Sequence, residues 1–250
     1  MIAVGLVLAF AIGITLGLFG GGGSILTVPV FVYVLGFDPK LAIAMSFPVV
    51  GATSLMGSIG HWRAGNVRLS SALLFGLVAM AGSFGGARAS QLLDGRVQLL
   101  ILGIVMAAAA VLMLRSAGRN SAEILVPTTP SPAMYLVALS VGALTGVIGI
   151  GGGFLIVPAL VVFGQVPIRE AVGTSLLVIA MNCVSGFAGQ RDVRAIPWPF
   201  VISFSAVAIA GILAGTRFAQ FVPQRTLKRG FAALLLVIAA VVLWQNHSKL

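Results

Sequence analysis

Two glycine-rich runs contain the residues best suited to bind a ligand. The first run supplies Gly20, Gly22, Gly23 and the adjacent Ser24, and the second supplies Gly149, Gly151, Gly152 and Gly153. Glycine permits unusual backbone dihedral angles and lets a ligand approach the main chain. Where such a run opens a helix, unpaired N–H groups at the positive end of the helix dipole attract anions. The runs therefore predict an anion site, with close helix packing as the alternative.

A few neutral polar residues lie inside apolar stretches downstream of the glycine runs. They are Ser46 in the first half of the chain, and Thr174, Ser175 and Asn182 in the second. A lone Ser or Thr in a membrane helix usually bonds to its own helix, which is the alternative for each hydroxyl. Neutral groups also suit a site that holds an oxyanion without trapping it. We therefore assign these residues to the candidate substrate site.

Arg88 and Arg217 occupy matching positions, each after a Gly-x-Arg step. Arginine pairs with planar oxyanions, so both could control access or gating from a vestibule. The favoured alternative is a cation at a helix end that marks the membrane interface. His61 and Gln190 also match; they could serve a proton-coupled step, but helix capping is the simpler interpretation.

Other chemistries find no support in the sequence. There is no catalytic triad, paired-carboxylate site or metal cluster, and Cys183 is the single cysteine. Neither glycine run has the Lys-Ser/Thr of a phosphate-binding loop or the context of a dinucleotide site. No acidic residue interrupts an apolar run, which argues against a cation pump based on carboxylates. We expect no cofactor, no metal and no enzymatic activity.

The composition requires a lipid bilayer. Hydrophobic residues make up 59% of the 250 residues and charged residues 8%, with a mean hydropathy of +1.14. A soluble domain carries about 25% charged residues, and about twenty apolar residues span a bilayer as a helix. The net charge of +10 is scattered singly through loops. It fits the positive-inside rule and no nucleic-acid partner.

An internal repeat with an offset of 129 residues organises the chain. Gly13, Gly17, Gly20, Gly22, Gly23, Leu26, Val28 and Pro29 recur as Gly142, Gly146, Gly149, Gly151, Gly152, Leu155, Val157 and Pro158. Generic hydrophobicity would not keep glycines and prolines in register, so a duplication is indicated. The predicted halves are 1–115 and 134–250, joined by a proline-containing polar linker at 116–133.

Each predicted half holds five apolar segments. They are 2–19, 24–36, 41–60, 69–87 and 97–114 in the first half, and 134–149, 153–163, 171–189, 197–216 and 230–244 in the second. The second segment of each half is short and carries a proline, and Ser46-Phe47-Pro48 is expected to interrupt the third segment of the first half. This predicts eight to ten membrane segments, including broken or re-entrant helices, a pattern that points to a transporter site.

Topology depends on whether the short segments cross. If they do, the repeats are inverted and Lys and Arg divide nine to six between the two sides. If they do not, the repeats are parallel and the division is eight to seven. The positive-inside rule favours the inverted arrangement.

The glycine runs with Val28-Pro29 and Val157-Pro158 resemble the repeated element of the TauE/SafE sulfite-exporter family. The stretch 171–176, Ala-Val-Gly-Thr-Ser-Leu, resembles that family's second element. The resemblance covers nearly the whole chain and implies a bacterial inner-membrane carrier of sulfite, sulfonates or related anions. The first half departs from the pattern at 44–48, Ala-Met-Ser-Phe-Pro, which suggests an asymmetric pocket.

We therefore expect a secondary transporter, with export as the favoured direction, for a small sulfur-containing or organic anion. The pocket would lie where the glycine runs meet, with the third segments beginning helices at the depth of Thr174 and Ser46. Two alternatives stay open: a membrane-embedded enzyme acting on a lipid phosphate, and a non-transporting assembly subunit. Assembly into a homo-oligomer is also left open.

Overall fold

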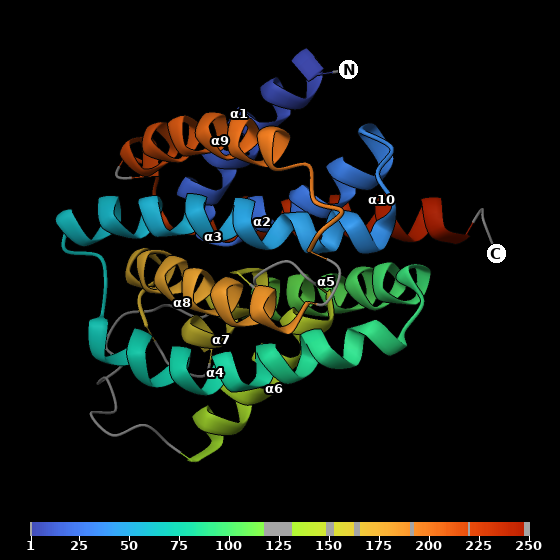
Figure 1. Ribbon diagram of the computed structural model, residues 1–250. Coiled ribbons are helices and arrows are strands. Elements are labelled where there is room, and N and C mark those ends of the chain that lie inside the picture. Colours follow the sequence, from blue (N-terminus) through green and yellow to red (C-terminus); the bar gives the residue numbers. More distant parts are fainter. Residues whose placement is uncertain are drawn as a thin grey trace.

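The computed structural model describes residues 2–117, 132–148, 153–162, 166–190, 193–219 and 221–247, and every regular element in them is helical (Figure 1). The first half forms α1 (Ile2–Phe19), α2 (Gly22–Pro29), a π-helical turn (Val30–Val34), α3 (Pro39–Arg63), α4 (Leu69–Ala89), a 3-10 turn (Ser90–Leu92) and α5 (Gly95–Ala117). The second half forms α6 (Pro132–Ile148), α7 (Gly153–Val162), α8 (Ile168–Gly189), α9 (Trp198–Ala219) and α10 (Gln224–His247).

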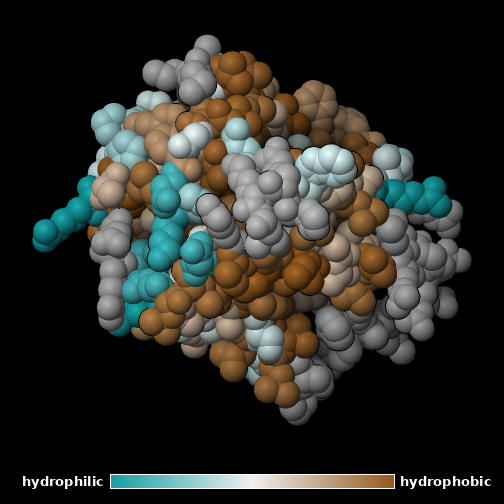
Figure 2. Space-filling view, turned by 90° about the vertical axis from the view of Figure 1, so that its right-hand side faces the viewer, coloured by the Kyte–Doolittle hydropathy of each residue, from teal (hydrophilic) through white to brown (hydrophobic). Residues whose placement is uncertain are grey.

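The outside of the helices is apolar, as a bilayer requires. Four helical stretches are long and apolar enough to cross a membrane: Pro39–Arg63, Leu69–Leu92, Ile168–Gly189 and Trp198–Ala219. Leu77, Ile104 and Ile202 are 60%, 61% and 64% exposed. Figure 2 shows hydrophobic residues over much of one face, with the hydrophilic ones mainly toward its margins. The predicted all-α membrane fold is confirmed.

Helices α1 and α2 form a hairpin that reverses the chain at Gly20. This residue has a φ of +70°, in the left-handed region that glycine adopts at little cost. After the reversal, Gly23 packs on α1 so closely that an added Cβ would lie 2.7 Å from the backbone nitrogen of Leu16. Further along, Leu35 reaches Gly5. The short second segment therefore runs back along α1.

Glycines interlock α1 with α9 and α4 with α6. A Cβ added to Gly13 would lie 2.8 Å from the backbone nitrogen of Ile212, and one added to Gly142 would lie 2.8 Å from the carbonyl carbon of Ala79. Gly142 is the repeat counterpart of Gly13, and α6 and α4 are the counterparts of α1 and α9. The same close approach therefore joins the two halves twice, as small-xxx-small patterns allow.

Helices α3 and α8 occupy the centre of the molecule. In each, 67% of the apolar span is buried, against 39% in α4 and α9. They cross in opposite directions, because Gly51 meets Cys183 at one point while His61 meets Gly173 farther along. Figure 1 shows the same pair running antiparallel through the middle.

The repeat counterparts run in opposite directions elsewhere too. Helix α9 runs parallel to α3, since Gly57 and Gly60 of α3 meet Ile212 and Thr216 of α9 in the same order. Helix α4 runs parallel to α8, the counterpart of α3. These directions are compatible with the inverted repeat, which stays a prediction. The division at 1–115, 116–133 and 134–250 also stays a prediction, and residues 118–131 of the linker lie outside the described residues.

One expectation about α3 was wrong. The helix runs without a break from Pro39 to Arg63 and contains Pro48. Proline has no N–H to donate to the carbonyl of Ala44, four residues earlier, and this usually ends a helix. Here Phe47 is fully buried beside the proline. Ala44, 4% exposed, is also buried and lines a cavity. Packing around Phe47 therefore outweighs the lost hydrogen bond.

Candidate functional site

The glycine runs of the two halves meet in the interior. A Cβ added to Gly153, at the start of α7, would lie 2.7 Å from the Cα of Gly21. One added to Gly20 would lie 2.7 Å from the Cα of Val172 on α8. Gly22 begins α2. Gly149, Gly151 and Gly152 lie outside the described residues. Backbone from both halves therefore converges at one buried centre, which we call the glycine centre (Gly20, Gly21 and Gly153).

The hydroxyls assigned to the site donate to backbone carbonyls. Ser24 donates to the carbonyl of Gly21 at 2.7 Å, and Ser46 donates to that of Ile43 at 2.7 Å. Ser175 donates to Val172 at 2.8 Å, with the carbonyl of Gly20 at 3.3 Å. These are the own-helix bonds of the alternative interpretation. Ser175 nevertheless lies directly at the glycine centre, as the prediction required.

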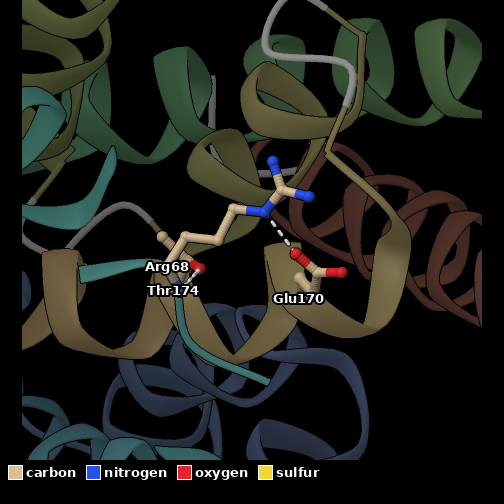
Figure 3. A network of polar contacts seen from close by, with 3 residues as sticks. All are labelled: Arg68, Glu170 and Thr174. Atoms are coloured by element: carbon tan, nitrogen blue, oxygen red, sulfur yellow. Dashed lines mark hydrogen bonds and ion pairs between the residues drawn. The ribbon is translucent and has the colours of Figure 1, made fainter. Parts of the chain in front are cut away.

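Thr174 lies near one end of α8. Its hydroxyl accepts a hydrogen bond from the backbone N–H of Arg68 at 3.0 Å, and the guanidinium of Arg68 pairs with the carboxylate of Glu170 (Figure 3). Helix α8 begins at Ile168, three residues before the predicted segment start at 171, so Thr174 lies inside the helix and not in its first turn. Pro167 sets the earlier start because its fixed φ suits the residue that precedes a helix.

Asn182 is the assigned residue with unused hydrogen-bonding capacity. It is fully buried, and neither its Oδ1 nor its Nδ2 has a partner. It lies seven residues after Ser175 and three after Ile179, on one side of α8. Ser175 faces Gly20, and Ile179 faces Gly153. An unpaired buried amide costs about 1–3 kcal/mol. Asn182 therefore places polar capacity on the side of α8 that faces the glycine centre, about 10.5 Å along the helix from Ser175, at a cost in stability.

Arg88 and Arg217 lie apart from the glycine centre. Each is exposed in the last turn of its helix, α4 or α9. The guanidinium carbon of Arg88 lies 5.1 Å from the centre of the Phe84 ring, a cation–π contact on the surface. This placement matches a cation at a helix end, the favoured alternative of the sequence analysis.

A polar cavity of about 460 Å³ opens at the end of α3 where that helix begins. Its polar lining consists of Asp38, Lys40, Ser90, Gln91, Gln98 and Gln190. We call it the polar vestibule. Sequence reasoning missed it, because its residues come from four separate stretches of chain. The sequence signal that could have indicated it is the pair Gln190 and His61, two polar residues at corresponding positions of the repeat.

A much smaller pocket, of about 30 Å³, lies at the other end of α3. Its lining includes His61, Asn66, Arg169, Val172, Ala219 and Leu227. The offset of 129 relates the two cavities: Lys40, Ile43, Ser90 and Gln98 correspond to Arg169, Val172, Ala219 and Leu227, and Gln190 and Ala195 to His61 and Asn66. We call this smaller cavity the closed pocket. The polar vestibule at one end of α3 is therefore much larger than the corresponding closed pocket at the other end.

Several contacts hold the closed pocket shut. The Arg68–Glu170 ion pair joins the start of α4 to the first turn of α8. Nε2 of His61 lies 3.2 Å from the carbonyl oxygen of Gly17, and Nη2 of Arg169 donates to the carbonyl of Val222 at 3.2 Å. A third cavity, of about 440 Å³ between α3 and α8, has an apolar lining that includes Phe47, Leu55, Met181 and Val184, and offers little to an anion.

Comparison with known proteins connects this arrangement to a family. The family model described as sulfite exporter TauE/SafE matches residues 5–242, which include both glycine runs. The chain belongs to the TauE/SafE family. It is therefore an integral membrane transporter of the TauE/SafE type, and the resemblance drawn from the glycine runs is confirmed.

Relatives of this TauE/SafE protein occur in bacteria and archaea. A "Probable membrane transporter protein" of Xylella fastidiosa (strain 9a5c) is 35% identical, over 96% of this chain and 94% of the relative. The "Probable membrane transporter protein YdhB" of Bacillus subtilis is 26% identical, over 88% and 91%. The "Probable membrane transporter protein MJ0441" of Methanocaldococcus jannaschii is 25% identical, over 84% and 79%. No solved structure matches the chain.

Proposed function

We propose that this TauE/SafE protein is a secondary transporter that exports small sulfur-containing or organic anions, such as sulfite or sulfonates, across the bacterial inner membrane as a multi-pass protein. The meeting of the two glycine runs supports the proposal most strongly. It brings Gly21 and Gly153 into backbone contact, on the side of α8 that also carries the unpaired amide of Asn182 farther along the helix. Non-helical backbone at membrane depth is tolerated where it is enclosed by protein or lines a passage.

The chemistry of the centre suits an anion in transit. The residue before α2, Gly21, supplies no side-chain cap, so the first N–H groups of α2 have no side-chain partner there. With the Asn182 amide they offer neutral donors to an oxyanion. Such dipoles avoid the cost of a bare Lys or Arg inside the membrane and the tight binding of a full ion pair. The anion would thus be stabilised and still released.

The energetics favour export without ATP. A monoanion that leaves a cell with an inside-negative potential gains about 2.3 kcal/mol per 100 mV. Uptake against that potential would require a coupled ion. The membrane potential alone would therefore drive the transport that we propose.

A flux screen in liposomes tests the proposal. Purified protein is reconstituted, and the flux of sulfite, thiosulfate, sulfoacetate, taurine and chloride is measured under an imposed potential. We expect saturable flux of at least one sulfur anion that exceeds chloride flux and follows the potential. Flux equal to that of protein-free liposomes for every compound would refute the proposal, as would a preference for chloride.

A further inference from the structure

The polar vestibule has the chemistry of a binding site in its own right. Lys40 brings a cation to its lining. The Nε2 of Gln190 is buried and has no hydrogen-bond partner, and the Oε1 of Gln98, whose side chain is 3% exposed, also has none. One unpaired donor and one unpaired acceptor thus share a cavity of about 460 Å³ with a lysine.

The charge balance of the vestibule favours an anion. Among the described lining residues Asp38 is the acidic one, and the Oδ1 of Asp38 accepts hydrogen bonds from the backbone N–H groups of Lys40 at 2.9 Å and Leu41 at 3.4 Å. The carboxylate therefore caps the first turn of α3, where the helix dipole offsets its charge. The ammonium group of Lys40 has no such partner within its own turn. A small oxyanion can use it together with the amide of Gln190.

The other glutamines are held in place by backbone contacts. Nε2 of Gln91 donates to the carbonyl of Gly189 at 2.8 Å, and Nε2 of Gln98 donates to that of Ser90 at 2.6 Å. The second bond leaves the Oε1 of Gln98 as a fixed acceptor. A ligand that pairs with every open group must therefore carry a negative oxygen and also an O–H or N–H donor.

The repeat places a second cation at the corresponding point of the closed pocket. Arg169 in the closed pocket corresponds to Lys40 in the vestibule, so a basic residue is present in both. At a second pair of corresponding positions the residue types differ: Gln190 lines the vestibule and His61 lines the closed pocket. The cavity at each end of α3 is therefore lined by a Lys or an Arg: Lys40 of α3 at one end and Arg169 of α8 at the other. The cavities differ in size, about 460 Å³ against about 30 Å³.

We propose that the polar vestibule is an access site that binds the transported anion at one mouth of the protein, through Lys40 and Gln190, with Gln98 selecting oxyanions that carry a hydrogen-bond donor. The inference rests on the proposed transport function. It adds a second binding site away from the glycine centre. It also narrows the substrate class: the vestibule should bind hydrogen sulfite and hydroxy- or amino-sulfonates more tightly than oxyanions without an O–H or N–H donor.

Thiol labelling tests binding independently of transport. Cys183, the single cysteine, is replaced by Ala, and Ala195 in the vestibule lining is replaced by Cys. An anionic methanethiosulfonate is then added to proteoliposomes with and without isethionate, a hydroxy-sulfonate of the proposed class that, unlike sulfite, does not react with the reagent. We expect isethionate to slow labelling of the A195C variant at least about three-fold. Labelling that isethionate leaves unchanged would overturn the access site even if the protein transports sulfite.

Kinetics separate the access site from the glycine centre. The K40Q and Q190L variants should raise the KM for sulfite flux about three- to ten-fold at little change in maximal rate, since a partly exposed charge adds modest binding energy. Arg63→Gln removes an exposed cation at the other end of α3 and is the matched control, with an unchanged KM. A wild-type KM in both vestibule variants would overturn the assignment. If the unmodified protein shows no flux, the proposed function is contradicted. The labelling rate of the A195C variant would still test whether the vestibule binds an anion.

Discussion

A Cβ atom added to Gly153 would lie 2.7 Å from the Cα of Gly21, so the main chains of the two halves touch where each reverses or restarts a helix. No side chain fits between them. Gly21 precedes α2, and Gly153 begins α7. A shift of either short helix must therefore be felt by the other half.

The contact predicts that Gly153→Ala impairs transport. The new methyl group would overlap the side chain of Ile179 and the backbone at Gly21. Overpacking of this kind costs about 1–3 kcal/mol. We expect sulfite flux in proteoliposomes to fall at least about ten-fold. Trimming the neighbour in a Gly153→Ala/Ile179→Val double variant relieves the side-chain clash alone. Full recovery of flux in that variant would show that glycine-to-glycine contact is not required.

The interlocking glycines predict a loss of stability at Gly142. A methyl group there would press on the backbone of Ala79, so Gly142→Ala should lower the denaturation temperature of the detergent-solubilised protein through a cost of about 1–3 kcal/mol. Gly85 lies in α4 with nothing within 4 Å of an added Cβ, so Gly85→Ala is the matched control. Equal denaturation temperatures for the two variants would contradict the packing account.

The Arg68–Glu170 ion pair predicts a change in access to the closed pocket. Both side chains are partly exposed, at 28% and 30%, so water screens the pair and it should contribute no more than about 1 kcal/mol. Arg68→Gln should therefore speed thiol labelling of Asn66→Cys, in the Cys183→Ala background, by at most about five-fold. The charge-swapped Arg68→Glu/Glu170→Arg variant should slow it again. Labelling rates that stay the same in both variants would show that the ion pair does not restrict access to the closed pocket.

Asn182 predicts a gain in stability when its amide is removed. Leucine has the same branched skeleton, and the two amide atoms of Asn182 have no partners in the described structure. Asn182→Leu should raise the denaturation temperature in anion-free detergent, through a gain of about 1 kcal/mol or more. A clear decrease would mean that the amide is satisfied in the native protein and serves packing.

The sequence predicted the helical architecture well because hydropathy and glycine periodicity directly reflect membrane burial. The convergence of Gly20 and Ser175 was also foreseen. The hydroxyl partners could not be: whether Ser46 donates to a ligand or to Ile43 depends on one rotamer. Thr174 lies inside α8, since that helix begins at Ile168, directly after Pro167 and three residues before the predicted segment.

The polar vestibule escaped prediction for a different reason. Lys40, Gln91 and Gln98 each look like ordinary polar residues at a helix end. The packing of α3, the 3-10 turn Ser90–Leu92 and α5 brings them to one cavity. Their counterparts in the other half, such as Leu227 for Gln98, are apolar in places, so the repeat alone did not mark them either.

The most direct test of the central claim, that an anion passes through the glycine centre, is the rate of potential-driven sulfite flux through Asn182→Leu in proteoliposomes. The same substitution that should stabilise the protein removes the unpaired buried amide from the side of α8 that faces Gly20 and Gly153. A hydrogen bond to a charged ligand is worth about 1.5–3 kcal/mol. We predict that flux falls at least about ten-fold while the amount of reconstituted, folded protein is unchanged. Sulfite flux with the wild-type KM and maximal rate would contradict the account and place the passage elsewhere.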